Sequence, residues 1–351
     1  MRKNFCAAWA VTICLTILIL VPRTVVAKPG LLDIAEWPVT SSIHGGVLLL
    51  SDAPEYVGSE GIMYEDRAKG DIRIFFHHVN DLPDPVQVGV VLESIDGAPV
   101  SVTVRRVGIS SPDPDYLRAG KQVQFDYFKD QLPYTVEVPA GKPLWLLPNR
   151  EQPLVRKGQL VTGMLDLTAD RELRVRLVMK SAHRNLAKFV KNAKTLPPGE
   201  PQLRGKFVGS DRLFLPDKVY DPQRDGRIAV TLADGIKDKF MQGWDATRNI
   251  QTENYGNYGI VYQLMIPTTG TGKFRCRIYP RGGVFAGWVL VRYNQQNSLI
   301  AVPAASVSFG DQGGDANQLL GEFEAGSVLW LRFSPPGSSN LPVRVVLEPV
   351  Q

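Results

Sequence analysis

The sequence predicts an all-β protein of two tandem sandwich-like domains that a short helix joins, and three observations support this. Short stretches that alternate apolar and polar residues recur along the chain, and β-branched and aromatic residues dominate them. Turn-forming glycines and prolines, 32 and 26 in number, separate these stretches at short intervals. Four sequence blocks of the first half return in the same order in the second half, which indicates a duplicated domain.

The duplication rests on two clear matches and two weaker ones. The blocks and their second copies are residues 61–64 with 259–262, 140–146 with 325–331, 51–55 with 233–238, and 173–178 with 341–347. Trp145 and Trp330 occupy equivalent positions in the second block, each between two leucines. A strand that is apolar on both faces usually lies between two layers, so we interpret both tryptophans as packing residues rather than ligand platforms.

The N-terminal segment has the pattern of an export signal. A positively charged start precedes a long apolar run that ends near Val21, and small residues follow up to Ala27. We expect residues 1–27 to be a signal peptide that is cleaved after Ala27. An uncleaved membrane anchor is the alternative, because the apolar run is long for a signal core. The mature protein is expected outside the cell or in its envelope, with no membrane span.

Removal of this segment changes the charge and the cysteine content. The chain has 40 Lys+Arg and 35 Asp+Glu, and the signal holds three basic residues and no acid, so the mature charge is 37 − 35 = +2. This charge density is too low to favour nucleic acid as a partner. Cys276 is the one cysteine left, so an intrachain disulfide is impossible and Cys276 is interpreted as a buried, inert thiol.

Strands are expected on both sides of one helix. Period-two alternation predicts strands over residues 71–76, 86–91, 100–104, 121–125 and 172–177. Residues 182–194 instead carry apolar residues at helical spacing, and a proline-rich stretch follows. We expect an immunoglobulin-like or jelly-roll-like sandwich in residues 28–181, a helix and Pro-rich linker in 182–201, and a second such sandwich in 202–351. A barrel is the alternative.

The sequence contains no catalytic motif. The four histidines lack the spacing of a transition-metal site, and no G-x-S-x-G elbow is present, so no catalytic triad can be assembled. We therefore predict a protein that is not an enzyme. Paired carboxylates for glycoside hydrolysis stay open, because their separation in space is not readable from the sequence.

One loop resembles a calcium-binding loop. Asp311, Asp315, Asn317 and Glu322 place oxygen ligands at suitable intervals, although Ala316 stands where such a loop needs glycine. These four residues form the candidate calcium site. A polar turn between two strands, with no cofactor, is the alternative.

A second candidate site contains exposed aromatic residues. Trp244, Asp245, Tyr255 and Tyr258 lie in a loop-like stretch of the second domain, near several amides. Rings beside amides and carboxylates can stack on a sugar and hydrogen-bond it, or can anchor a protein interface. The alternative is a long loop that packs its aromatic rings onto the sandwich.

Three segments carry a resemblance to other proteins. Residues 257–262, 279–283 and 340–349 resemble a pattern in uncharacterised exported bacterial proteins, some of which are labelled after copper amine oxidase accessory domains. This resemblance implies an envelope or extracellular β protein and no particular activity. Copper amine oxidases modify a tyrosine in an Asn-Tyr-Asp/Glu motif and bind copper through H-x-H. This chain has Asn-Tyr-Gly at 254–256 and 257–259 and no H-x-H, so oxidase chemistry is not expected.

Together these patterns predict an exported, non-catalytic protein of the cell envelope or the extracellular space that binds or assembles with an envelope component, a glycan or a protein. The alternative is a carbohydrate-binding or carbohydrate-active protein that uses the aromatic region around Trp244. A surface-layer or appendage subunit is a third possibility. The ligand and the oligomeric state do not follow from the sequence.

Overall fold

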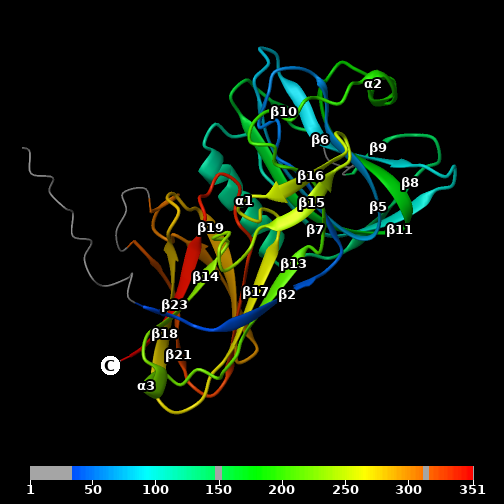
Figure 1. Cartoon of the computed structure of the whole chain (residues 1–351). Coiled ribbons are helices and arrows are strands. Elements are labelled where there is room, and N and C mark those ends of the chain that lie inside the picture. The colour runs from blue at the N-terminus through cyan, green and yellow to red at the C-terminus, as the bar shows by residue number, and fades with distance from the viewer. Residues whose placement is uncertain (1–33, 147–151, 311–315, 351) are drawn as a thin grey trace, which may run out of the picture. The chain divides into compact units, whose positions relative to one another are not determined.

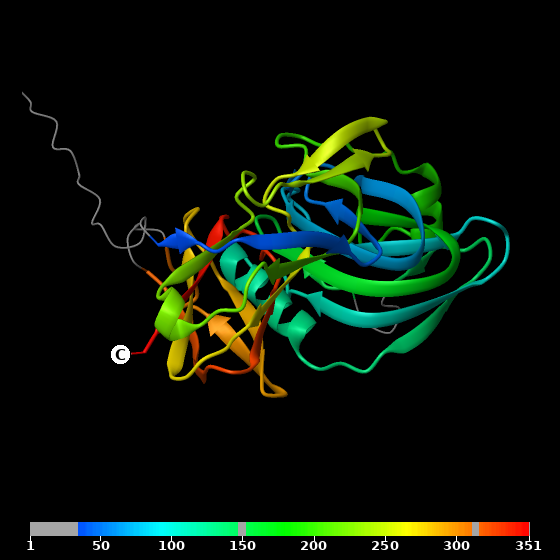
Figure 2. The same cartoon turned by 60° about the horizontal axis from the view of Figure 1, so that its bottom comes forward.

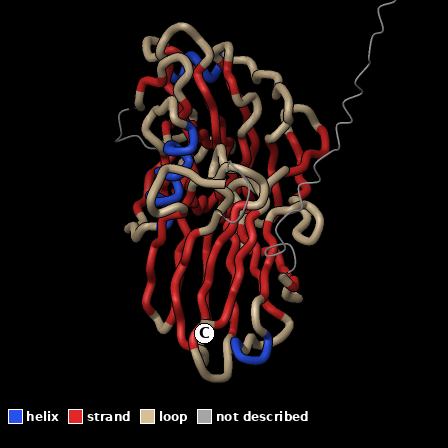
Figure 3. Tube along the Cα trace, turned by 90° about the vertical axis from the view of Figure 1, so that its left-hand side faces the viewer, coloured by secondary structure: helices blue, strands red, loops and turns tan. Residues whose placement is uncertain are grey.

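The computed structural model describes residues 34–146, 152–310 and 316–350. In these ranges the chain forms 23 strands and three helices, so the predicted all-β class is confirmed (Figure 1). Strands fill most of the tube in Figure 3, and the helices are short. The expected signal peptide, residues 1–27, lies outside the described residues.

Two sheets form a β-sandwich from the C-terminal half and the first two strands. The five-stranded sheet has the order β1 (Ala35–Glu36), β14 (Ile228–Leu232), β23 (Val343–Pro349), β18 (Lys273–Pro280) and β21 (Gln318–Glu324). The six-stranded sheet has the order β2 (Val39–His44), β13 (Asp211–Pro216), β17 (Val261–Pro267), β22 (Val328–Phe333), β19 (Gly287–Tyr293) and β20 (Gln296–Val302). Alternate residues of both sheets meet in one core, for example Phe274 and Cys276 with Leu329 and Leu331. The predicted burial of Cys276 is confirmed.

The third sheet has twelve strands. Its main path is β10 (Leu154–Val155), β6 (Val86–Ser94), β11 (Leu160–Ser181), β5 (Gly61–Asn80), β3 (Val47–Ser51), β12 (Arg204–Val208), β15 (Met241–Asp245) and β16 (Ile250–Asn254). Four further strands pair beside this path: β4 (Tyr56–Val57), β7 (Val100–Ile109), β8 (Tyr134–Val138) and β9 (Leu144–Trp145).

The long ribbon of β5 and β11 divides this sheet into two layers. β11 pairs with β7 over residues 163–169 and with β6 over residues 173–181, and its register against β5 shifts between Ala169 and Leu173. Apolar side chains from both halves, such as Leu165 and Leu177, belong to one core. The two halves of the ribbon therefore enclose a second sandwich-like core.

The two predicted domains share strands. β1 and β2 come from the first predicted domain, yet they pair with β14 and β13 of the second. Conversely, β12, β15 and β16 extend the twelve-stranded sheet beyond β3. Residues 182–201 therefore do not separate two contiguous sandwiches, and Ile34–Gln351 forms one compact unit.

The helices differ from the prediction at one point. α2 (Leu186–Asn192) lies inside the predicted helical stretch and buries Phe189 and Val190, against which Trp145 packs.

The strand predicted at 121–125 is wrong, because these residues lie in α1 (Tyr116–Phe128). Asp115 caps α1 by accepting a hydrogen bond from the backbone N–H of Arg118. The apolar residues of α1 continue at helical spacing past the five alternating positions.

The remaining helix, α3 (Pro222–Asp225), is a single turn that Asp221 caps. Within the described ranges the longest helix has 13 residues, and none is long and apolar enough to cross a membrane.

Candidate functional site

The main candidate site is a groove on the outer face of the six-stranded sheet. β22 sends Leu329, Leu331 and Phe333 into the core, so the residues between them, Trp330 and Arg332, face outward and are half-buried. A bare sheet face would leave both side chains in water. They are half-buried here because the end of α1 lies across this face.

α1 lies against the six-stranded sheet (Figure 2), where aromatic and polar contacts hold it in place. The ring of Phe125 lies 5.0 Å from that of Trp288, centroid to centroid. The ammonium group of Lys121 donates hydrogen bonds of 2.6 Å and 2.9 Å to the carbonyl oxygens of Pro303 and Ser306, which follow β20. The groove therefore has one wall of helix and a floor of sheet.

The groove has a volume of about 500 Å³ and an excess of positive charge. Its charged lining consists of four cations and one acid, with aromatic and amide side chains between them: Arg106, Lys129, Arg292, Arg332, Asp130, Phe125, Phe128, Trp330, Gln263 and Asn297. Leu290 and Leu299 complete the floor. Among the described residues, Arg106, Arg292 and Arg332 form no ion pair. A half-enclosed groove with three arginines that lack carboxylate partners attracts anions.

Arg332 is the least satisfied of these arginines. Its Nε atom is buried and has no hydrogen-bond partner in the described part of the chain. Burial lowers the pKa of Arg332, and the nearby cations Arg106 and Arg73 lower it further, while Tyr127 and Asp211 act in the opposite direction. The Nε–H of this guanidinium loses hydration without gaining a hydrogen bond, so a bound anion would stabilise it.

A network behind the groove holds α1 in place. Arg73, 4% exposed, pairs with Asp166 and Asp211, with nitrogen–oxygen distances of 2.7 Å in each pair. The hydroxyl of Tyr127 on α1 donates a 2.7 Å hydrogen bond to Asp166. Arg106 donates a 3.0 Å hydrogen bond to the carbonyl oxygen of Tyr127. The helix wall is therefore tied to β5, β7, β11 and β13, which makes the groove a preformed site.

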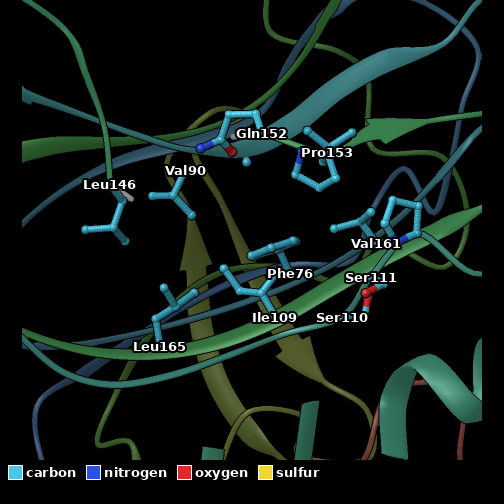
Figure 4. A pocket seen from close by; sticks show the side chains of 13 residues that line it. Phe76, Val90, Ile109, Ser110, Ser111, Leu146, Gln152, Pro153, Val161 and Leu165 are labelled. Atoms are coloured by element: carbon cyan, nitrogen blue, oxygen red, sulfur yellow. The ribbon is translucent and has the colours of Figure 1, made fainter. Parts of the chain in front are cut away.

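A separate internal cavity lies between the two layers of the twelve-stranded sheet (Figure 4). It has a volume of about 210 Å³, and most of its walls are apolar side chains, namely Phe76, Val88, Val90, Ile109, Leu146, Pro153, Val161 and Leu165. Apolar cavities of about 150 Å³ stay dry and accept small apolar molecules. This cavity therefore suits only a small uncharged molecule.

The serines on the wall of this cavity already have partners. The backbone N–H of Ser110 donates to the carbonyl of Thr162, and the Ser110 hydroxyl accepts a 3.1 Å hydrogen bond from the backbone N–H of Thr162. The backbone N–H of Ser111 donates to the side chain of Gln122. These groups are used within the protein, so the cavity has less to offer a polar ligand than the groove has.

Two of the four predicted ligand-binding residues are exposed and two are largely buried. Trp244 on β15 is 45% exposed, and Tyr255 is 55% exposed just after β16, where it packs edge-on against Phe240. Asp245 is 2% exposed. Tyr258 is mostly buried, and its hydroxyl donates to the carbonyl of Ser339. Asp245 and Tyr258 are therefore not accessible to a ligand, whereas Trp244 and Tyr255 are.

Asp245 has a structural role instead. Its carboxylate accepts a 2.9 Å hydrogen bond from Nε of Arg204, which is 1% exposed. The other nitrogens of Arg204 donate to the carbonyls of Met63 and Leu196 and to the hydroxyl of Thr247, at 2.8–2.9 Å. This buried pair joins β12 to β15 and has no capacity left for a ligand.

Only part of the predicted calcium site can be placed. Asp311 and Asp315 lie outside the described residues. The side-chain oxygen of Asn317 accepts a 2.8 Å hydrogen bond from Arg277, and Glu322 pairs with Arg275 on the neighbouring strand β18. Both placed residues thus have arginine partners. Among the described residues, no three His, Cys, Asp or Glu side chains gather closely enough to hold a metal ion.

The described residues also contain a buried serine–histidine pair. The hydroxyl of Ser51 lies 2.9 Å from Nε2 of His78, whose Nδ1 lies 2.8 Å from the carbonyl oxygen of Pro54. Both side chains are 0% exposed. Burial lowers the pKa of His78 to about 4. A substrate has no access to this pair, which acts here as part of the core.

Comparisons with known proteins do not identify a family. No family model and no curated protein matches the chain. Fet3p, a multicopper oxidase that functions in iron import, is 9% identical with a TM-score of 0.13, over 77% of this chain and 52% of its own length. The 11S allergen from Cocos nucifera is 11% identical with a TM-score of 0.14, over 85% and 90% of the two chains. Oxalate decarboxylase from Bacillus subtilis is 8% identical with a TM-score of 0.13, over 88% and 77%.

TM-scores this low do not establish a shared fold, so these structures indicate no activity, metal or ligand for this chain. None of the three is a copper amine oxidase, and the resemblance to proteins labelled after the accessory domains of that family stays a prediction.

Proposed function

We propose that the protein is an exported, non-catalytic binding protein whose site is the groove between α1 and the six-stranded sheet, and that its ligand is anionic. One observation carries this proposal: the groove contains three arginines without ion-pair partners in the described residues, and the Nε of one of them, Arg332, is buried without a hydrogen bond. Arginine recognises carboxylate, sulfate and phosphate groups through two parallel hydrogen bonds. Export remains an expectation from the sequence.

The chemistry of the groove supports binding rather than catalysis. Its one acid, Asp130, is exposed, and the lining includes no histidine, serine or cysteine. Hydrolysis of a glycoside generally requires two carboxyl groups on either side of the scissile bond, and nucleophilic catalysis requires an activated side chain. The carbohydrate-binding alternative is compatible with this groove. The region around Trp244 offers less support for it, because Asp245 and Tyr258 are largely buried there.

The test uses inorganic sulfate as the probe and compares two arginine variants of equal charge. Arg332→Gln removes the half-buried guanidinium, and Arg281→Gln removes an exposed arginine that follows β18 and does not line the groove. Isothermal titration at constant ionic strength should show sulfate binding to the wild type and to R281Q. The affinity of R332Q should be at least tenfold lower, the loss of about 1.4 kcal/mol expected for a charge-assisted hydrogen bond.

The proposal would be overturned if the wild type did not bind sulfate, or if R281Q and R332Q lost affinity equally. Thermal unfolding of each variant verifies that the fold is intact. Weaker binding as salt is raised is a further expected outcome, because charge attraction at a partly exposed groove is screened.

A further inference from the structure

The groove continues beyond Trp330 into a second hollow on the same sheet face. This second hollow has a volume of about 310 Å³ and lies against the turn after β19 and the start of β22. Trp330 and Arg292 line both hollows. The indole ring and the side chain of Arg292 therefore form the boundary that the two adjoining hollows share.

The distance along β22 sets the length of a ligand that could use both hollows. Val328 lines the second hollow and Arg332 the first, so four residue steps separate their far ends. At about 3.3 Å per residue this is roughly 13 Å of strand. A single sulfate or carboxylate would occupy one end only. An elongated ligand is required to contact both ends at once.

The polar side chains along this path are mainly amides and a hydroxyl. Gln263 and Asn297 line the first hollow, and Asn294, Gln295 and Ser327 line the second. The backbone at Asn294 and Gln295 has positive φ angles of 47° and 64°, and these two residues form the tight turn between β19 and β20. Amides that donate and accept at the same time suit ligands with many hydroxyl groups.

The backbone of β22, the central strand of the groove floor, is not available to a ligand on this face. β22 pairs with β17 on one side and with β19 on the other, so its N–H and C=O groups are used in the sheet. An extended peptide gains much of its affinity from backbone hydrogen bonds to a sheet edge, which the inner strand β22 beneath Trp330 and Arg332 does not provide. Aromatic rings, amides and cations favour a ligand that is recognised through ring faces, hydroxyls and acidic groups.

We propose that the ligand is a chain of acidic sugars that runs along the groove, with one ring against the indole of Trp330 and acidic groups at Arg332 and Arg292. This inference rests on the proposed function, because it names the class of anion that the groove takes. Carboxylate and sulfate groups on the sugar offer the same chemistry to the arginines, so both types of acidic saccharide are tested.

The experiment measures how affinity depends on ligand length. Galacturonate of one, two and four units, a sulfated disaccharide, the neutral cellotetraose and tetra-aspartate are titrated into the wild type, with tryptophan fluorescence and calorimetry as readouts. We expect at least a tenfold gain in affinity from monomer to tetramer, weaker binding of the neutral tetramer, and weaker binding of tetra-aspartate. A sulfated disaccharide that binds more tightly than digalacturonate identifies sulfate as the preferred group.

Two variants test the role of the ring. Trp330→Ala should lose the gain in affinity with length and still bind sulfate, while Trp330→Phe should retain part of that gain. Trp244→Ala, which removes an exposed tryptophan outside the groove, should match the wild type.

The outcomes separate this inference from the proposed function. If tetragalacturonate binds no better than the monomer while sulfate still binds in an Arg332-dependent manner, the sugar-chain inference is wrong and the anion groove stands. If tetra-aspartate binds more tightly than any saccharide, the ligand class is wrong. If neither sulfate nor any oligosaccharide binds, the proposed function fails together with the inference.

Discussion

Arg204 and Arg332 both have guanidinium atoms that are shielded from water, but they differ in the hydrogen-bond partners that the protein supplies. On β12, Arg204 is 1% exposed and donates to one carboxylate, two carbonyls and one hydroxyl. In the groove, Arg332 is half-buried, and its Nε has no partner in the described part of the chain. Buried charges in proteins normally have partners. A complete set of partners indicates a structural role for Arg204, and the missing partner suggests a binding role for Arg332.

The comparison also shows how a sequence pattern can mislead. Asp245 beside Trp244 has the composition of a sugar site, yet the carboxylate belongs to Arg204 and the ring points elsewhere. Arg332 lies within an ordinary strand, and nothing in its neighbourhood in the sequence marks it. The environment of each charge, which only the folded chain supplies, distinguishes the two cases.

The largest expected effect is on the Arg204 side. Arg204→Met leaves Asp245 as an uncompensated buried charge, so we expect the free energy of unfolding to fall by about 3–5 kcal/mol. Urea denaturation of the folded protein measures this change. Arg171→Met is the control, because Arg171 and Asp96 form an exposed ion pair, which should contribute little to stability. Equal losses for both variants would contradict the structural role assigned to Arg204.

A smaller effect concerns pH and the two neighbouring histidines of β5. Burial lowers the pKa of His77 to about 3 and that of His78 to about 4, from an ordinary value of 6.5. The unfolded chain therefore takes up protons first, so the stability is complete above pH 6.5 and falls as the pH drops toward these native values. The loss should reach about 2 kcal/mol per histidine at pH 5.

Unfolding by urea at pH 7.5 and pH 5 tests this expectation. His77→Gln should reduce the difference between the two pH values by about 2 kcal/mol. The exposed His183 provides the control, since His183→Gln should leave the difference unchanged. A pH dependence that is the same in all three proteins would show that His77 does not titrate as its burial implies.

The smallest effect brings the comparison back to Arg332. Arg332→Met removes a poorly hydrated cation and keeps an apolar side chain on the sheet, so we expect a gain of about 1 kcal/mol in stability. The same variant should lose sulfate binding. Thermal and urea unfolding measure the first effect, and titration the second. A clear loss of stability would mean that Arg332 holds the fold together and would remove the contrast with Arg204.

Much of the fold can be predicted from the sequence. Period-two alternation and frequent turns predicted the all-β class, and the apolar face of Cys276 predicted its burial, which raises the pKa of this thiol. The alternation at 121–125 predicts a strand because five residues fit either period. Those residues belong to α1, whose helical spacing is visible only when Ala119, Val123 and Tyr127 are taken together.

The candidate site could not be predicted for two physical reasons. Its wall is the helix α1, where the sequence pattern predicts a strand. Its floor comes from β17, β19, β20 and β22, which lie more than 130 residues away in the chain. Trp330 occupies the position of Trp145 in the sequence repeat, and this equivalence predicts a packing role for both rings. Trp145 does pack under α2, whereas Trp330 lines the groove. Equivalent sequence positions thus have different surroundings, because different helices cover them.

The pairing of β1 and β2 with β14 and β13 has a consequence for the way this chain acquires its structure. These are the earliest described strands to be synthesised, and their partners follow more than 160 residues later. Contacts between distant segments slow folding, and strand edges that wait for a partner are prone to association with other chains. Until the second half of the polypeptide has been synthesised, β1 and β2 have no strand partners. We therefore expect chaperones that bind the nascent chain to cover these two segments.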